Sequence, residues 1–302
     1  MGDTLIPNIV HFIFGLKPDF GKRSFSYIHY LAIISAYKQL NPEKIHFHYE
    51  YEPDGYWWER AKNFIELNNV CGPKQIFGNP ITNYQHMADV LRLEILSKFG
   101  GIYLDIDIIS LNSCKELLYH KNVMGIEPSV GLCNAVIFAQ KNSDFIAKWY
   151  ETYRSYSEEN WNYFSIQMPM KIACTLGNDV NITGYYPFYY PFYKDTAHLY
   201  LWGQKQDYQK KLSSFIKNSI IKCMTFIPYH NTKYIPILHQ FKPYQWHYQK
   251  LNSSNFLHLW ETLWWDKYLK HISPETILNN TEKLFNRLII DRLSKNEING
   301  KI

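Results

Sequence analysis

Two aspartates one residue apart, Asp105 and Asp107, follow a pair of glycines and a short apolar run. The isoleucines and leucine around them predict a buried strand, in which alternate side chains point to the same side. Two carboxylates at the end of such a strand repel each other and are costly to desolvate unless a cation or strong hydrogen bonds compensate them. Paired carboxylate oxygens suit Mg²⁺ or Mn²⁺, which keep positions open for phosphate oxygens. The pair therefore indicates a divalent-metal site for a phosphorylated ligand.

The segment before this pair predicts an amphipathic helix that ends at Gly100. Its apolar residues recur with helical spacing at Ala88, Leu91, Ile95 and Phe99. Asp89 and Arg92 stand three residues apart and so share one face of that helix. On an arbitrary helix they would form an ordinary surface ion pair. Because this helix leads directly into the paired aspartates, we interpret them as part of the same site.

The pattern Ala-Asp-x-x-Arg, a helix, and then Gly-Gly-x-Tyr-x-Asp-x-Asp, over residues 88–107, resembles the DXD sugar-binding region of glycosyltransferase family 32. That family includes yeast-type initiating mannosyltransferases and bacterial capsule enzymes. The glucosylating domains of the large clostridial toxins carry a similar block. An isolated Asp-x-Asp is a weak signal, but the composite of helix, glycine turn and acid pair is specific.

Two weaker blocks extend the resemblance, which covers residues 5–145 well and the remainder thinly. Residues 6–15 are similar to the first strand of the family, with Phe14 where an aromatic residue, usually Trp, is expected. Near the end, residues 233–236 and 256–265 are similar to its closing segments. There Leu263 stands in place of a serine, with Thr262 beside it.

Strands and helices alternate through residue 155, which predicts an α/β sheet with its ligand at the carboxyl ends of the strands. We expect strands at 5–14, 45–52, 101–109, 123–127 and 135–139, and helices at 24–40, 57–68, 88–99, 143–156 and 282–296. The resemblance implies a GT-A type nucleotide-sugar-binding fold, with a single mixed sheet flanked by helices. We expect one glycosyltransferase domain over residues 1–270 and a helical C-terminal tail over 271–302.

The resemblance also implies the metal site. Asp107 would ligate the metal directly and Asp105 would bridge ribose and metal, and together with Arg92 they form the expected catalytic set. His258 is the candidate for the third protein contact, with His198 as its rival. Histidine suits Mn²⁺ better than Mg²⁺, so Mn²⁺ is the expected cofactor and Mg²⁺ the alternative.

The remaining donor contacts are expected from residues on both sides of the acid pair. Asp89 and Arg92 would hold the hydroxyls of the donor sugar, and a forked guanidinium also suits the diphosphate. Phe14 would stack on the nucleobase or pack in the core, and Tyr103 would line the donor site or pack in the core. Trp260 or Trp264 would close over the diphosphate.

The resulting hypothesis is a metal-dependent retaining hexosyltransferase that uses a nucleotide-diphosphate sugar, with UDP favoured over GDP. Its acceptor would be a glycan or a protein- or lipid-linked hydroxyl. In the mechanism that the resemblance implies, the acceptor attacks on the face that the diphosphate leaves, so no enzymic nucleophile is needed. The alternatives are a catalytically weak nucleotide-sugar or glycan-binding protein and a nucleotide-sugar hydrolase.

Composition and charge limit the ligands and the cellular location that we expect. The chain has 302 residues and a formal net charge of +5, spread without a basic block, which suits anionic substrates and does not indicate nucleic-acid binding. Aromatic residues make up 17% and suit stacking on sugars; the run at 185–193 would form an acceptor platform or pack as a lid. Five widely spaced cysteines indicate free thiols. No signal peptide or long apolar run is present, so we expect a cytoplasmic protein, one soluble in a host cell if viral, or a piece of a longer chain.

Overall fold

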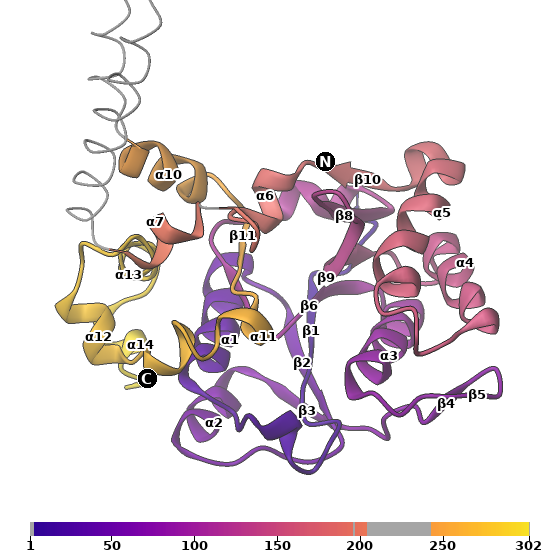
Figure 1. The fold of residues 1–302 in the computed structure, drawn as a ribbon, viewed down its shortest axis with the longest axis horizontal. Helices are drawn as coiled ribbons and strands as arrows, with labels where there is room; N and C mark the ends of the chain where they lie inside the picture. Colours follow the sequence, from indigo (N-terminus) through magenta and orange to yellow (C-terminus); the bar gives the residue numbers. More distant parts are fainter. Residues whose placement is uncertain (1–2, 196, 204–242, 302) are drawn as a thin grey trace, which may run out of the picture.

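The computed structural model describes residues 3–195, 197–203 and 243–301. The segment 233–236 and Cys223 lie outside the described residues. The central element is a mixed sheet of seven strands in the order β10-β8-β9-β6-β1-β2-β3 (Figure 1). Its strands are β1 (Ile9–Ile13), β2 (Lys44–Tyr49), β3 (Glu66–Asn69), β6 (Gly101–Leu104), β8 (Asn122–Glu127), β9 (Gly131–Ala139) and β10 (Asn181–Thr183).

Most neighbouring strands in this sheet run parallel, and β9 is antiparallel to both β6 and β8. Two small antiparallel pairs lie outside the main sheet. They are β7 (Ile108–Ser110) with β11 (Phe256–His258), and β4 (Gln75–Ile76) with β5 (Asn79–Pro80).

Helices cover both faces of the sheet. Successive residues of its strands point to opposite faces, and both sets are apolar. Ile102 and Leu104 of β6 join one core cluster, and Tyr103 between them joins the other. In Figure 1, α3, α4 and α5 lie on one side of the sheet, and α1 with the C-terminal helices on the other. The helices are α1 (Tyr27–Leu40), α2 (Tyr56–Ala61), α3 (Tyr84–Phe99), α4 (Asp144–Thr152), α5 (Met168–Leu176), α6 (Tyr185–Tyr189), α7 (His198–Trp202), α10 (Pro243–Asn252), α11 (Glu261–Trp264), α12 (Pro274–Asn279), α13 (Leu284–Ile290) and α14 (Lys295–Ile298).

The predicted mixed sheet flanked by helices, with further helices at the C-terminus, is confirmed, and two small sheets accompany it. The C-terminal helices pack into the same core cluster as the sheet. Tyr30 of α1 donates its hydroxyl to the carbonyl of Glu297 at 2.7 Å, and Tyr27 donates to Ile298 at 3.0 Å. The division of the chain at residue 270 stays a prediction.

Two predicted helices were wrong in extent. The helix expected at 57–68 ends at Ala61, and Glu66–Asn69 instead forms the edge strand β3 in parallel register with β2. The half-polar sequence of that strand tolerates an edge, where one side faces water. The helix expected at 282–296 is divided into α13 and α14. Ser294 begins the second with a capping box to Glu297, which restarts the helix after a break.

The described chain contains no helix that combines the length and apolarity needed to cross a membrane. The four cysteines among the described residues, Cys71, Cys114, Cys133 and Cys174, are free thiols.

A buried histidine pair lies directly beneath the glycine turn that leads into β6. His11 Nε2 lies 3.0 Å from the carbonyl oxygen of Gly100, and His11 Nδ1 lies 3.1 Å from His48 Nε2. The carbonyl can only accept, so His11 donates from Nε2 and accepts from His48 at Nδ1. Burial lowers the pKa of His11 to about 3 and that of His48 to about 4. Both are therefore neutral in the native protein at neutral pH.

We expect acid to destabilise the protein through this pair. In the unfolded chain both histidines have a pKa of about 6.5 and bind protons below that pH, whereas native His11 and His48 stay neutral. The free energy of unfolding therefore falls as the pH is lowered from 6.5 to about 4. Near pH 5 the loss is roughly 2 kcal/mol per histidine. Urea unfolding at neutral and acid pH measures it. His48→Gln should flatten this pH dependence, whereas substitution of the exposed His120 should not; equal slopes in all variants would contradict the assignment.

Both glycines of the turn have a positive φ and no room for a Cβ, and Gly101 makes the closer approach. Its φ is +106°, and an added Cβ would lie 2.5 Å from the carbonyl oxygen of Ile9. We expect Gly101→Ala to lower the free energy of unfolding by about 2–4 kcal/mol, because backbone strain and a clash with main chain add together. Gly184→Ala is the matched control, since a Cβ there meets nothing within 4 Å. Urea denaturation of both variants makes the comparison, and equal stabilities would count against this account.

Candidate active site

The two aspartates lie in a turn and not within a strand, so that part of the prediction was wrong. Strand β6 ends at Leu104, and the turn that follows is closed by the Ile108 N–H donating to the carbonyl of Asp105 at 3.0 Å. The break coincides with a change of strand partner. Asp105 still donates its N–H to Ala135 of β9 at 2.8 Å, but beyond it the chain leaves β9 to pair with β11.

Pairing of β7 with β11 brings a distant segment of the chain onto this turn. His258 is opposite Ile108 in the antiparallel register. The N–H of Glu261 donates to Asp107 Oδ2 at 2.8 Å, and the N–H of Leu259 donates to the Asp107 carbonyl at 3.1 Å. The main chain on both sides therefore fixes the relative positions of Asp107 and His258.

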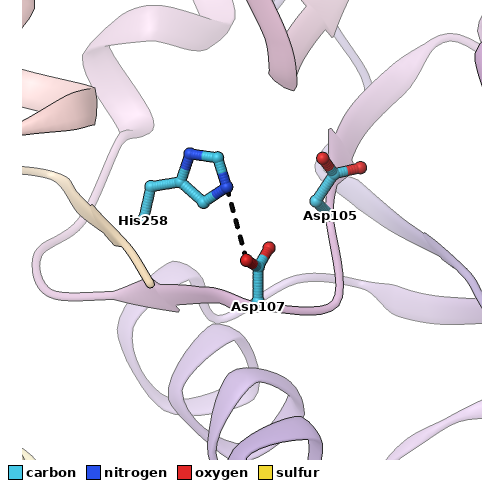
Figure 2. Close-up of side chains that lie close together, drawn as sticks. All are labelled: Asp105, Asp107 and His258. Carbon is cyan, nitrogen blue, oxygen red and sulfur yellow. Dashed lines mark ion pairs between the residues drawn. The ribbon is translucent and has the colours of Figure 1, made fainter. Parts of the chain in front are cut away.

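Figure 2 shows Asp105, Asp107 and His258 converging from these segments. One ligand atom from each lies within 4.8 Å of the others. His258 Nε2 lies 3.4 Å from Asp107 Oδ2. Two carboxylates and one imidazole form a donor set that fits a divalent cation such as Mn²⁺ or Mg²⁺.

The pKa shifts at this cluster describe an ion pair. Burial acts to raise the pKa of Asp107, but His258 and the Glu261 N–H outweigh it, and the pKa falls below its usual value. Burial acts to lower the pKa of His258, but the Asp107 carboxylate outweighs it, and the pKa rises. Nδ1 of His258 is buried without a hydrogen-bond partner among the described residues. A cation would take the place of the imidazole proton between these groups, because a histidine ligand must be neutral.

Arg92 holds the other half of the site. Its guanidinium lies 3.0 Å from Asp89 Oδ1 and 3.2 Å from Asp105 Oδ1, and it donates to the carbonyl of Asn134 at 2.7 Å. Its carbon centre lies 4.5 Å from the centroid of the Tyr103 ring. Burial raises the pKa of Asp89 even though Arg92 opposes it. Arg92 is only 4% exposed, so its guanidinium is a cation fixed between two carboxylates.

Tyr103 and Asn134 position these carboxylates. Tyr103 donates its hydroxyl to Asp105 Oδ1 at 2.7 Å, and Asn134 donates from its amide to Asp89 Oδ1 at 2.7 Å. Asn134 was not predicted as a site residue, although a polar residue within an otherwise apolar strand could have indicated it. The same holds for Glu127 at the end of β8, whose pKa is raised by burial.

These groups line one cleft of about 460 Å³. Eight of the predicted site residues are among its lining residues: Phe14, Asp89, Arg92, Tyr103, Asp105, Asp107, His258 and Trp260. Other side chains that line it include Lys17, Phe20, Arg23, Tyr84, Glu127, Cys133, Asn134, Trp161, Asn162, Ser165, Tyr193, Thr262 and Leu263. Phe14 stacks on Phe20 with ring centroids 5.7 Å apart, and the Trp260 ring centroid lies 3.9 Å from that of His258.

The structure does not bring Trp264 or His198 to this cleft. Their rings contact each other, with centroids 5.4 Å apart, and Trp264 belongs to the core cluster. Of the two histidines considered for the metal, only His258 lies beside the aspartates. The aromatic run at 185–193 is largely packed into the core, and its last residue, Tyr193, lines the cleft.

A model of the family described as "Glycosyltransferase sugar-binding region containing DXD motif" matches residues 21–124. Glucan organizing enzyme 1 of Cryptococcus neoformans var. grubii is 32% identical over 298 residues, which cover 94% of this chain and 70% of that protein. Fold and site together define a glycosyltransferase. The chain belongs to the glycosyltransferases with a DXD-containing sugar-binding region, of the family 32 type.

Solved structures of glycosyltransferases are distantly similar. GlyE of Streptococcus pneumoniae TIGR4 is 13% identical, with a TM-score of 0.40 over 94% of this chain and 64% of that chain. The bifunctional glycosyltransferase WbbM is 9% identical, with a TM-score of 0.45 over 100% of this chain and 52% of that chain.

Substitution of Arg92 tests whether its buried guanidinium stabilises the carboxylates around it. We expect Arg92→Met to destabilise the protein by about 3–5 kcal/mol, because it leaves buried carboxylates uncompensated. The double variant Asp89→Asn/Arg92→Met should be more stable than the single one, because one of those charges is gone. Lys44→Met breaks the exposed ion pair with Glu66 and serves as a control that should change little. Additive effects of the two site substitutions, measured by urea unfolding, would show that the groups are not coupled.

Proposed function

We propose that the chain is a metal-dependent retaining glycosyltransferase that moves a hexose from a nucleotide-diphosphate sugar, with UDP favoured, to a hydroxyl of a glycan or similar acceptor. The observation that carries the proposal is the convergence of Asp105, Asp107 and His258 in the same cleft as the Asp89–Arg92 pair. Family membership supports glycosyl transfer, and the donor set supports a divalent cation.

The three convergent residues would hold the cation, which when bound neutralises the departing diphosphate. Arg92 is buried, permanently charged and held by two carboxylates, so it can present positive charge to a phosphate without reorganising. Asp89 and Asn134 present an oxygen and an amide on the same wall for sugar hydroxyls. The stacked rings of Phe14 and Phe20 would receive the nucleobase.

In the proposed transfer an acceptor hydroxyl oxygen bonds to the anomeric carbon while the bond from that carbon to the diphosphate breaks. The acceptor proton passes to the departing phosphate oxygen, and both events take place on one face of the sugar. Trp260 would cover this region, since its indole lies against His258 and donates to the Pro191 carbonyl at 3.1 Å. The name of the fungal relative favours a glucan setting for the acceptor.

Calorimetry of nucleotide-sugar binding tests the donor site. Titration of UDP, GDP and their glucose, galactose, N-acetylglucosamine and mannose derivatives should show binding with Mn²⁺ that EDTA abolishes. Asp107→Ala and His258→Ala should weaken it by about a hundredfold or more, because each removes a metal ligand. Asp266→Ala is the matched control, since its carboxylate is exposed on the surface.

Binding that is unchanged by EDTA would refute the metal role, and absence of binding to every nucleotide sugar would refute the transferase proposal. The NMR coupling of the anomeric proton in the product checks the stereochemistry of the same reaction. An inverted anomer would contradict retention.

A further inference from the structure

A large exposed aromatic side chain lines the same cleft as α11. Trp161 is 51% exposed and lines the cleft beside Asn162 and Ser165. Thr262 and Leu263 of α11 also line it, and Leu263 is 55% exposed. An exposed Trp that lines a polar cleft is a candidate ligand contact, because a large apolar side chain with no such role is usually buried.

The position of Trp161 is fixed by the structure around it. Its ring contacts the buried ring of His86 on α3, with centroids 4.8 Å apart, and His86 Nδ1 lies 2.6 Å from the hydroxyl of Tyr156. A π-helical turn, Tyr163–Gln167, follows at once, and Trp149 donates its indole N–H to the Phe164 carbonyl at 2.6 Å within it. Such turns are rare and are frequent at functional sites.

The same segment is tied to the donor-sugar wall. A Cβ at Gly131 of β9 would lie 2.3 Å from the carbonyl oxygen of Ile166, so these two backbones are in close contact. Gly131 and Asn134 belong to the same strand, and Asn134 bonds to Asp89. The segment that carries Trp161 is therefore packed against the strand that carries Asn134, one of the residues that would bind the donor sugar.

The chemistry of this wall suits a neutral saccharide. A sugar ring has an apolar C–H face that packs on an aromatic ring and a rim of hydroxyls that need hydrogen bonds. Trp161 offers the aromatic surface, and Asn162 and Ser165 offer an amide and a hydroxyl. The lining residues on this segment, 161, 162, 165 and 166, include no charged side chain.

We propose that Trp161, with Asn162 and Ser165, forms the acceptor subsite, and that the acceptor is a saccharide chain. This inference rests on the proposed function, because it names the acceptor of that same cleft. The bound saccharide places one hydroxyl toward the donor sugar, and its oxygen becomes the new glycosidic oxygen.

The test separates the acceptor subsite from the donor site. The donor found by calorimetry is incubated with Mn²⁺ and with water alone, with short oligomers of glucose, mannose or galactose, or with a serine-rich peptide. Trp161→Ala should raise the KM for the oligosaccharide by about tenfold or more, which corresponds to loss of one aromatic stacking contact. Donor hydrolysis by water should stay within about twofold of wild type, because it needs no acceptor contact.

Trp161→Phe keeps an aromatic face and should retain most of the oligosaccharide activity. Tyr119→Ala is the matched control, since Tyr119 is 43% exposed and does not line the cleft. An unchanged oligosaccharide KM in Trp161→Ala, an equal fall in hydrolysis, or a better rate with the peptide would overturn the proposal.

Direct calorimetry of the oligosaccharides on the protein without donor keeps the two proposals distinct. Binding that Trp161→Ala abolishes would support the acceptor subsite even if no nucleotide sugar were bound or hydrolysed. Failure of every oligosaccharide to bind wild type or to accept a hexose would overturn the subsite and leave the donor proposal standing.

Discussion

The site depends on one backbone pairing, in which β11 runs antiparallel to β7 immediately after the acid turn. This pairing carries residues about 150 positions away in the chain onto Asp107, whose carboxylate accepts the Glu261 N–H across a separation of 154 residues. A hydrogen bond from main chain to a buried carboxylate favours the ionised form and leaves the side chain little freedom. The same strand delivers His258, so one contact both orients an acid and supplies its partner.

The break in the sheet after Leu104 makes this pairing possible. A continuous strand would have kept Asp107 on β9 and left no edge for β11. The turn instead transfers the chain from the main sheet to a separate two-stranded sheet, and the acids lie at the junction. Polar groups gather at such junctions because main-chain pairing is interrupted there and side chains remain free to bind ligands.

Buried charge is the second feature that shapes the molecule. Arg92, Asp89 and Asp105 form a compact cluster in which the cation has two carboxylate partners. Such a cluster is a poor way to stabilise a fold, because desolvation offsets most of its attraction. It is a good way to hold charges in fixed positions for a ligand, since the neighbours that hold them, Tyr103 and Asn134, are themselves packed into the core strands.

The sequence determined what depends on short-range pattern. The alternation of strands and helices predicted the α/β sheet. Helix α3, the glycine turn and the acid pair are contiguous, so their spacing predicted that Asp89, Arg92, Asp105 and Asp107 share one site, and the structure places all four in one cleft. The sequence favoured His258 over His198, but only the tertiary structure places it beside the aspartates, because no local pattern records which distant strand pairs with β7. The tertiary structure likewise placed Trp161 at the cleft and Trp264 in the core, since burial depends on neighbours that are far away in the chain. Spacing along a helix or strand is local, whereas long-range pairing is set by the whole core.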